Sequence, residues 1–323
     1  MPAASGAIAK KPIIVVGSIN IDLVANTERI PGAGETVTGQ DFQIHHGGKG
    51  ANQAVAAARL GYPVQMIGRV GDDAFGSQLR TGLETAGVDT ASVATTPGSS
   101  GVAVIVVSGS GENSIVVIPG ANAHVTPADL DANIEILRSA GLVLTQLEIP
   151  LETVLHLASI CAREGVPLIL DPAPARELPQ DLFRHVAWFT PNETEAAFFA
   201  GNTAGTTSAR DQAPIAKILL EKGVQGVILK LGSQGAYIAS ADGLAQSIQS
   251  FPVHAVDTTA AGDCFNGTFA VGLLLGKSPV ESARFASAAS AISVTRPGAQ
   301  PSMPEMAEVE ELLRSGKVPT KAL

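Results

Sequence analysis

The sequence predicts an α/β fold in which helices flank a mostly parallel central sheet and a small β-sheet forms a lid. From about residue 125 onward, strand-like apolar segments alternate with helical segments, a pattern typical of a parallel sheet covered on both faces. Near the N-terminus, the apolar run 13–16 ends at Gly17 and predicts a buried parallel strand. Two β-rich or irregular segments, at about 21–46 and 100–119, interrupt the alternation, and we assign them to the lid.

Composition limits the domain organisation and the class of partner. The 323 residues, 45% of them hydrophobic, suit one large domain over 12–315, with a flexible leader at 1–11 and a tail at 316–323. A net charge of −9 without a basic stripe argues against a nucleic-acid or anionic-membrane partner. No apolar run is long enough to cross a membrane, and Cys161 and Cys264 form neither a metal-binding pair nor a disulfide framework. We therefore expect a cytoplasmic protein.

Polar residues follow the first strand directly. Asn20 and Asp22 lie just past its end, where ligands bind in open α/β sheets, although a plain polar turn would use the same residue types. Prolines and glycines break up the following segment, in which Thr36–Thr38 suits a short strand.

A glycine-rich segment over 47–52 precedes an Ala-rich helix over 53–60 that stops at Gly61. The glycines indicate either close approach of the backbone to a ligand or a flexible turn. Their spacing matches neither a Walker P-loop nor the dinucleotide-binding fingerprint.

The middle of the chain continues with a short strand over 64–67 and a helix that ends at Thr85. Asp72 and Asp73 are interpreted as caps of that helix. A hairpin over 101–118 follows, with arms at 102–107 and 115–118.

Four further strands are expected, and polar or glycine-rich residues follow each of them. Glu148 follows the first of the four. The segment Thr190–Glu193 is interpreted as a helix capping box, which leaves Asn192 and Glu195 available for a role near phosphate or a magnesium-bound water. The four strands span 142–147, 167–170, 186–189 and 227–230.

Small residues lead into Asp263, which begins an apolar helical segment over 264–275. We expect a turn at 260–263 whose backbone N–H groups, together with the helix dipole, can hold a phosphate. Asp263 would then lie beside the transferred charge and take the proton of an attacking hydroxyl. The alternative is that Asp263 is only an N-cap.

Several separated motifs occur together in one order, and together they resemble the PfkB family of carbohydrate kinases over residues 12–314, in particular its ribose-phosphorylating members. The resemblance implies ATP-dependent phosphorylation of D-ribose at O5 on the fold described above. The motifs are Gly17–Asp22, Gly47–Gln53, Gln146–Glu148, Pro172–Ala175, Thr190–Glu195, Asp257–Asp263 and Thr295–Ser302.

The resemblance also implies a set of site residues, with Asp263 as the catalytic base and the N–H groups at 260–263 as the anion hole. The residues expected to contact the sugar are Asn20, Ile21, Asp22, Gly48, Lys49, Gly50, Ala51, Asn52, Glu148 and Asp263. Those expected to contact ATP are Asn192, Lys230, Leu231, Gly232, Ser233, Gln234, Gly235, Ala260, Ala261, Gly262, Asp263 and Ser287. An activating potassium ion is expected at Asp257, Thr259, Ser293, Arg296, Gly298 and Ser302, and magnesium at Glu195.

Family members often dimerise through the β lid, so the resemblance also implies a homodimer here. The chain departs from the family pattern at Cys264 and Thr268, and at Lys230 and Ser287 among the nucleotide contacts. Because phosphoryl transfer is loose, an aspartate of ordinary pKa, about 3.9, is expected to suffice as the base.

Three other functions use the same features. The first is phosphorylation of another sugar, such as 2-deoxyribose or fructose, although Asn20 and Asp22 together favour vicinal hydroxyls. The second is a cysteine-dependent reaction, because a thiol at a helix N-terminus, such as that of Cys264, has a lowered pKa. The third is a non-catalytic sugar-binding regulator, against which the intact Asp263 and glycines argue.

Overall fold

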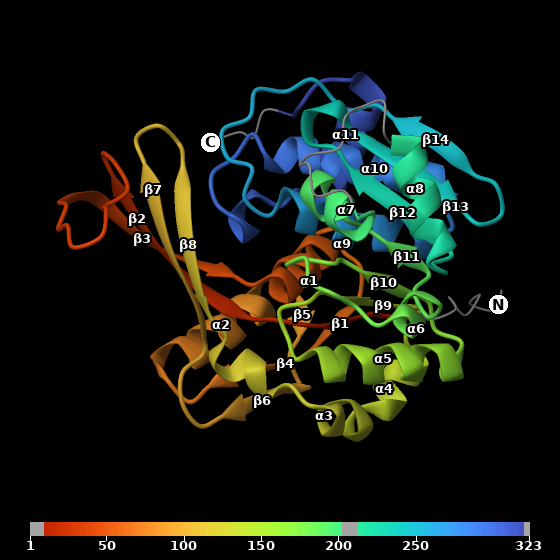
Figure 1. Cartoon of the computed structure of the whole chain (residues 1–323), viewed down its shortest axis with the longest axis horizontal. Helices are drawn as coiled ribbons and strands as arrows, with labels where there is room; N and C mark the ends of the chain where they lie inside the picture. The colour runs from red at the N-terminus through yellow and green to blue at the C-terminus, as the bar shows by residue number, and fades with distance from the viewer. Residues whose placement is uncertain (1–9, 202–211, 320–323) are drawn as a thin grey trace, which may run out of the picture.

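The computed structural model describes residues 10–201 and 212–319, shown in Figure 1. Most of the expected leader, residues 1–9, and the end of the expected tail, residues 320–323, lie outside the described residues. In the described ranges, no helix is long and apolar enough to span a membrane.

The central sheet is mostly parallel, as the sequence predicts, with an antiparallel pair of strands at one edge. Ile13 of the first strand lies opposite both Val64 and Leu142, so neighbouring strands end at the same side of the sheet. In spatial order the strands are β14 (Ala245–Ile248), β13 (Ala236–Ser240), β12 (Gly226–Lys230), β11 (Trp188–Phe189), β10 (Leu168–Leu170), β9 (Leu142–Thr145), β1 (Ile13–Val16), β4 (Val64–Gly71) and β5 (Val88–Asp89), and β6 (Val93–Thr96) pairs with the second half of β4.

Two hydrophobic cores lie on the two faces of this sheet. Alternate residues of β1 point to opposite faces. Ile13 and Val15 therefore join one core, and Ile14 and Val16 join the other. The first core is covered by α1 (Lys49–Arg59), α2 (Ala74–Thr85), α9 (Ala261–Leu274), α10 (Pro279–Ser293) and α11 (Met306–Ser315). The second is covered by α3 (Pro127–Ala132), α4 (Ile134–Ser139), α5 (Leu151–Glu164), α6 (Gln180–Phe183), α7 (Glu193–Phe199) and α8 (Gln212–Glu221).

The lid is a separate four-stranded sheet that extends from the body in Figure 1. One row of apolar side chains crosses all four strands in register, namely Ile44, Leu23, Val104 and Val116. The lid strands, in spatial order, are β3 (Gly39–Gly47), β2 (Asn20–Thr27), β7 (Gly101–Ser108) and β8 (Asn113–Ile118). The 3₁₀ helices of the described residues are η1 (Gly120–His124), η2 (Gly232–Gln234) and η3 (Gln300–Ser302).

The structure corrects three boundaries. Thr36–Thr38 is not a strand, because the pairing of β3 with β2 begins only at Gly39. β4 continues to Gly71 instead of ending at Ile67, since β6 supplies pairing for its second half. The helix expected over 53–60 already begins at Lys49, which brings the glycine-rich segment onto its first turn.

Candidate active site

The first site residues lie where β1 passes into the lid strand β2. Oδ1 of Asn20 accepts a hydrogen bond from Nδ2 of Asn122 over 2.7 Å, and Oδ1 of Asn122 accepts one from the backbone N–H of Ile19 over 2.9 Å. Asn122 thus fixes the position of Asn20 from η1, at the far end of the lid hairpin. Asn122 is not among the site residues expected from the sequence, because its partners lie more than 100 positions away.

Asp22 points toward the end of β3. A Cβ atom on Gly47 would lie only 2.1 Å from Oδ2 of Asp22, so glycine is required there for the carboxylate to keep its place. Burial, together with the nearby carboxylates of Glu148 and Asp263, raises the pKa of Asp22 to about 7, while Lys49 opposes the shift.

The N-terminus of α1 packs against the end of β1. Gly48 has a φ of +87°, and a Cβ on Gly50 would lie 2.7 Å from the backbone of Gly17, so both positions demand glycine. Oε2 of Glu148 accepts hydrogen bonds from Oγ of Ser18 over 2.6 Å and from the backbone N–H of Lys49 over 3.1 Å. Glu148 therefore joins the ends of β9 and β1 to the start of α1, and its role as a sugar contact stays a prediction.

Lys49 supplies positive charge to this acidic cluster. Burial alone would lower the pKa of its ammonium. The carboxylates of Asp263, Glu148, Asp171 and Glu195 outweigh burial and raise the pKa of Lys49 above its usual range. The side chain therefore stays protonated and offsets the charge of the surrounding acids.

Asp263 is not the N-cap of α9. The N-cap is Ala260, and Asp263 occupies the first turn with its side chain only 6% exposed. Its Oδ2 accepts from Nδ2 of Asn52 over 3.0 Å and its Oδ1 from Nε2 of Gln53 over 3.1 Å. The carboxylate is thus anchored on α1, a role that capping does not require.

The pKa of Asp263 differs from the ordinary value expected from the sequence. Burial raises the pKa to about 6, against the opposing charge of Lys49, and the nearby Asp171 raises it further. Hydrogen bonds from Asn52 and Gln53 hold the pKa down. An aspartate with this pKa is a stronger base than a free one and is still largely ionised at neutral pH.

The turn before α9 is strained. Ala260 has a φ of +57°, in the left-handed region that residues with a side chain rarely adopt. This conformation places the N–H groups of Gly262 and Asp263 in the first helical turn, where they have no partner within the helix. Strain of this kind persists at ligand-binding turns, and it fits the expected anion hole.

A buried ion pair adjoins the same turn. Nζ of Lys230 lies 2.9 Å from Oδ1 of Asp171, and the two side chains are 13% and 3% exposed. The same ammonium lies 3.3 Å from where a Cβ on Gly262 would be, so it reaches the N-terminus of α9. Lys230 is the last residue of β12, at the strand end where a nucleotide contact was expected, whereas Asp171 and Gln53 were not identified from the sequence as site residues.

The expected capping box is shifted by two residues. Asn192, not Thr190, is the N-cap of α7, and Glu195, not Glu193, completes the box. Oδ1 of Asn192 accepts from the N–H of Glu195 over 2.9 Å, and Oε2 of Glu195 accepts from the N–H of Asn192 over 2.8 Å. The local fold thus explains the two residues that had been left for phosphate and magnesium. Burial still raises the pKa of Glu195, against Lys230, which keeps it electrostatically part of the site.

The residues expected around a monovalent cation lie in the loop before α9, at the end of α10, in the loop that follows α10, and in η3. Oδ1 of Asp257 accepts from the N–H of Thr259 over 2.9 Å, and its Oδ2 accepts from the N–H of Gly298 over 2.7 Å. The side chain of Arg296 forms an ion pair with Glu308. It is therefore directed to Glu308 and not to Asp257, the carboxylate that joins the two loops. Two other members, Ser293 and Ser302, are buried and donate to the backbone carbonyls of Ser290 and Ala299.

The nucleotide contacts expected after β12 form a tight turn. Residues 232–234 form η2, and Leu231 donates to the carbonyl of Gly235 over 2.9 Å. Ser287 lies in α10, one turn before Ser290, whose hydroxyl donates to the carbonyl of Ala261 over 3.0 Å. This face of α10 therefore lies against the start of α9. The remaining expected sugar contacts, Ile21 and Ala51, are buried.

Cys264 does not have the lowered pKa that its place at a helix N-terminus predicted. Its side chain is fully buried, and burial raises the pKa of the thiol to about 12. Burial, reinforced by the charge of Asp263, therefore opposes a thiolate at this position.

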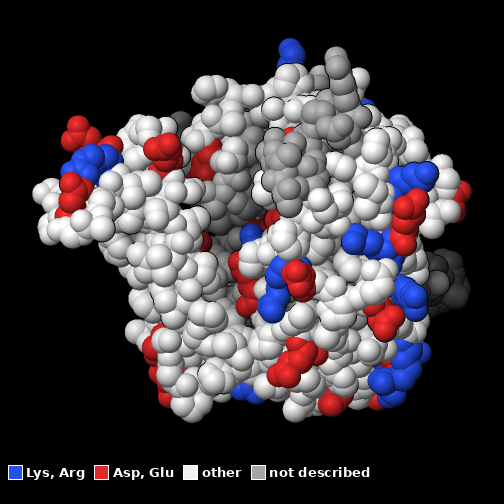
Figure 2. Space-filling model, viewed as in Figure 1, with Lys and Arg blue, Asp and Glu red and all other residues white. Residues whose placement is uncertain are grey.

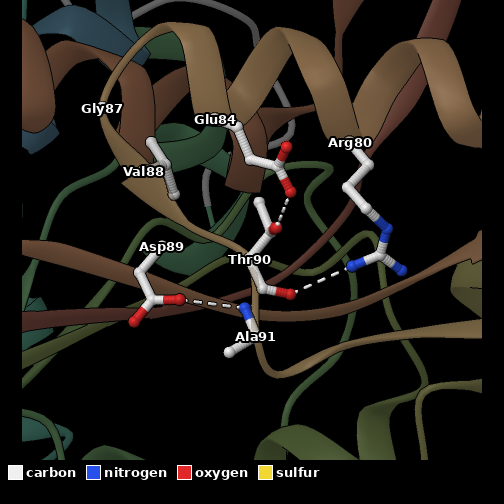
Figure 3. A pocket seen from close by; sticks show the side chains of 7 residues that line it. All are labelled: Arg80, Glu84, Gly87, Val88, Asp89, Thr90 and Ala91. Carbon is white, nitrogen blue, oxygen red and sulfur yellow. Dashed lines mark hydrogen bonds between the residues drawn. The ribbon is translucent and has the colours of Figure 1, made fainter.

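Figure 2 shows some acidic and basic side chains in a recess between the lid and the body, and others spread over the visible surface. A separate cavity of about 610 Å³ lies beside α2 and is shown in Figure 3. There Nη1 of Arg80 donates to the carbonyl of Thr90 over 3.0 Å, and the Thr90 hydroxyl donates to Glu84 over 2.6 Å. None of the expected sugar or ATP contacts lines that cavity.

Comparison with known proteins assigns the family. A model of the pfkB family carbohydrate kinases matches residues 10–306, and the chain therefore belongs to this family. It is 45% identical to a ribokinase of Bacillus subtilis over 302 residues, which cover 93% of this chain and 99% of the relative. It is also 39% identical to a deoxyribokinase of Salmonella typhi over 303 residues, covering 93% of this chain and 98% of that one.

A solved structure has the same fold. The structure of Arabidopsis thaliana ribokinase complexed with ribose and ATP superimposes with a TM-score of 0.87 at 36% identity, covering 94% of this chain and 99% of that one. The likeness confirms the expected α/β fold. The chain is a phosphotransferase that acts on a sugar hydroxyl, as its family membership indicates.

Proposed function

We propose that this protein transfers the γ-phosphoryl group of ATP to O5 of D-ribose, giving D-ribose 5-phosphate and ADP. The observation that carries this proposal is the buried Asp263 carboxylate, hydrogen-bonded to α1 and placed in the strained first turn of α9. A base and a set of backbone donors thus occupy the same turn. The ribokinases of B. subtilis and A. thaliana, to which the chain is similar, support ribose as the acceptor.

The sugar is bound by short polar side chains from strand ends and from α1. Asn20, Asp22 and Glu148 supply acceptors, and Lys49 and Asn52 supply donors. Vicinal hydroxyls suit this set, since each can donate to a carboxylate and accept from a neighbouring amide or ammonium. The sugar is thereby oriented with O5 toward Asp263.

In the transfer step, the bond between O5 and the γ-phosphorus forms while the bond between that phosphorus and the ADP oxygen breaks. The proton of O5 passes to the carboxylate of Asp263. Charge on the moving phosphoryl group is stabilised by the N–H groups of Gly262 and Asp263 and by the ammonium of Lys230, which reaches the same turn.

The residues present fit a nucleotide and its magnesium ion. Lys230 ends β12, the turn at 231–235 follows it, and Asn192 follows the neighbouring strand β11. All three offer donors for phosphate. Among the described residues, no cluster of three or more His, Cys, Asp or Glu could hold a metal by itself. Magnesium would therefore be bound largely by phosphate oxygens and water, with the Glu195 carboxylate acting through a water molecule.

The loops around Asp257 support activation by a monovalent cation. Asp257 ties the loop before α9 to the loop at Gly298, so an ion held there would stabilise the turn that forms the anion hole. Backbone carbonyls of Thr259, Ser293, Arg296 and Ser302 are the proposed ligands, because potassium prefers neutral oxygen donors.

We also propose a homodimer that pairs through the lid. Ile44, Val104 and Val116 belong to the apolar row across the lid and are 46%, 39% and 60% exposed. A contiguous exposed apolar surface of this kind is typical of an interface. A cytoplasmic location is proposed from the two cysteines, both buried and unpaired.

The test is ADP release with ATP and magnesium, comparing D-ribose, 2-deoxyribose, fructose and adenosine in potassium and then in sodium. Ribose-dependent turnover that potassium raises is the expected result. Turnover with 2-deoxyribose equal to that with ribose would overturn the roles of Asn20 and Asp22. Ribose binding without turnover would favour the regulator.

A further inference from the structure

Gln53 lies between Asp263 and a second buried carboxylate. Its Nε2 donates to Oδ1 of Asp263 over 3.1 Å and to Oδ2 of Asp171 over 2.9 Å. Its Oε1 accepts from Nε2 of Gln146 over 2.7 Å. Because Gln53, Gln146, Asp171 and Asp263 are all buried, water does not replace these hydrogen bonds.

The neighbours fix which way the amide of Gln53 points. In the opposite orientation its oxygen would face two carboxylates, neither of which can donate when ionised. Its nitrogen would then face the amide nitrogen of Gln146, which is also a donor. Only the orientation described above satisfies both sides.

The charged groups around Asp263 make this contact important. Lys49 from α1 is its positive neighbour, while Asp171 after β10 and Asp22 from β2 are negative ones. Lys230, near Gly262, forms an ion pair with Asp171 through the oxygen that Gln53 does not use. Gln53 therefore joins the Asp171–Lys230 ion pair to the carboxylate on the sugar side.

We infer that Gln53 is a positioning residue for phosphoryl transfer, which holds the Asp263 carboxylate ready to receive the O5 proton and separates it from Asp171. This inference rests on the proposed role of Asp263 as the base. Asn52 holds the other carboxylate oxygen and is itself an expected sugar contact. Gln53 holds Oδ1 of Asp263 in place whether or not sugar is bound, because all the hydrogen-bond partners of the Gln53 amide belong to the protein.

Gln53→Met tests the inference, since methionine is unbranched and of similar length but has no donor. Steady-state kcat, both KM values and the pH profile of kcat/KM are measured for it, for the wild type and for Gln78→Met. Gln78 is exposed on α2 and is the matched control. Gln53→Glu is a second variant of the same size that also removes the amide donors.

The expected result for Gln53→Met is a kcat lower by about 10- to 100-fold with both KM values unchanged, because a hydrogen bond to a charged group is lost. The acidic limb of its pH profile moves to higher pH by about one unit or more, since the carboxylate loses a donor. Gln53→Glu shifts the limb in the same direction, and Gln78→Met changes neither quantity.

Two results overturn the inference. One is wild-type kcat with an unmoved acidic limb in either Gln53 variant. The other is a loss of activity that is equal at all pH values, which indicates only a packing role. If thermal unfolding shows that Gln53→Met does not fold, the acidic limb of the pH profile of kcat/KM for Gln53→Glu decides the question. Absence of ribose-dependent turnover in the wild type would instead refute the proposed function, so the two failures are distinguishable.

Discussion

The side-chain amide of Asn52 donates to Oδ2 of Asp263 over 3.0 Å, although 211 positions separate the two residues. Through this bond, the first turn of α1 and the first turn of α9 share one carboxylate. The glycine-rich segment that leads into α1 and the small-residue turn that leads into α9 are therefore parts of one site, and both the sugar side and the phosphate side of that site meet at Asp263.

Asp263→Asn is expected to lower kcat by about 10²- to 10⁴-fold, because the general base is lost. The fold is retained, since Ala260 and not Asp263 is the N-cap. Coupled ADP release and thermal unfolding measure the two effects. Turnover within a few-fold of the wild type would remove Asp263 from the mechanism.

The same variant is expected to lose a pH-dependent part of the stability. The pKa of Asp263 is raised to about 6 in the folded protein, so its contribution to stability is full below about pH 4 and is lost as pH rises through 6. In Asp263→Asn this loss between pH 4 and pH 8 is expected to disappear, although the new amide nitrogen faces a donor of Asn52 or Gln53 and lowers the unfolding temperature at every pH. Thermal unfolding at pH 4 and pH 8 measures the difference, and the same pH dependence in both proteins would contradict the sign.

The pH profile of kcat/KM for ribose is expected to rise between about pH 5 and pH 8. Both carboxylates act in their ionised form, and their pKa values are about 6 for Asp263 and about 7 for Asp22. Because the two interact, the inflections belong to the pair. In Asp22→Asn the upper inflection is expected to disappear, and a profile that stays flat from pH 5 to 8 in the wild type would refute the assignment.

Gly47→Ala is expected to raise KM for ribose, because the new methyl would lie 2.1 Å from Oδ2 of Asp22. The methyl either displaces that carboxylate, which weakens sugar binding, or strains the strand, and overpacking of this kind destabilises a fold by about 1–3 kcal/mol. Gly39→Ala, in the same strand, is the matched control, since its methyl would meet the carbonyl of Asn26 at an ordinary 3.5 Å. Isothermal titration with ribose compares the two, and equal affinities would rule out steric placement of Asp22 by Gly47.

Lys230→Met is expected to raise KM for ATP and to destabilise the fold by about 3 kcal/mol, because Asp171 would be left buried without its cation. Lys217→Met is the control, since the Lys217 side chain is 78% exposed and its ion pair with Glu221 is long, at 3.9 Å. Denaturant unfolding and ATP titration report the two effects. Unchanged nucleotide binding would limit Lys230 to a structural role.

Much of the site could be predicted because sheet topology brings strand ends together. Asn20, Asp22 and Glu148 each follow an apolar strand, and the parallel register places those ends at one side of the sheet. Asp263 and its turn were recognisable from the run of small residues before an apolar helix. The alternation of strands and helices likewise predicted the central sheet.

The residues that sequence reasoning missed act through long-range partners. Gln53 lies inside an Ala-rich helix and resembles an ordinary surface glutamine until α9 and β10 are placed beside it. Asn122 and Asp171 are single polar residues in short connections, and only tertiary packing pairs them with Asn20 and Lys230. The raised pKa of Asp263 and the buried thiol of Cys264 were missed for the same reason, since burial is a property of the assembled fold.

Asn20 and Asp22 belong to β2, the lid strand that continues directly from β1 of the body. The two residues expected to bind the sugar are therefore part of the lid, and any tilt of the lid must carry them with it. Sugar binding and closure of the lid over the phosphate would then occur together. Such an enzyme would spend little ATP on water, because the enclosed state forms only when the proper acceptor is already inside.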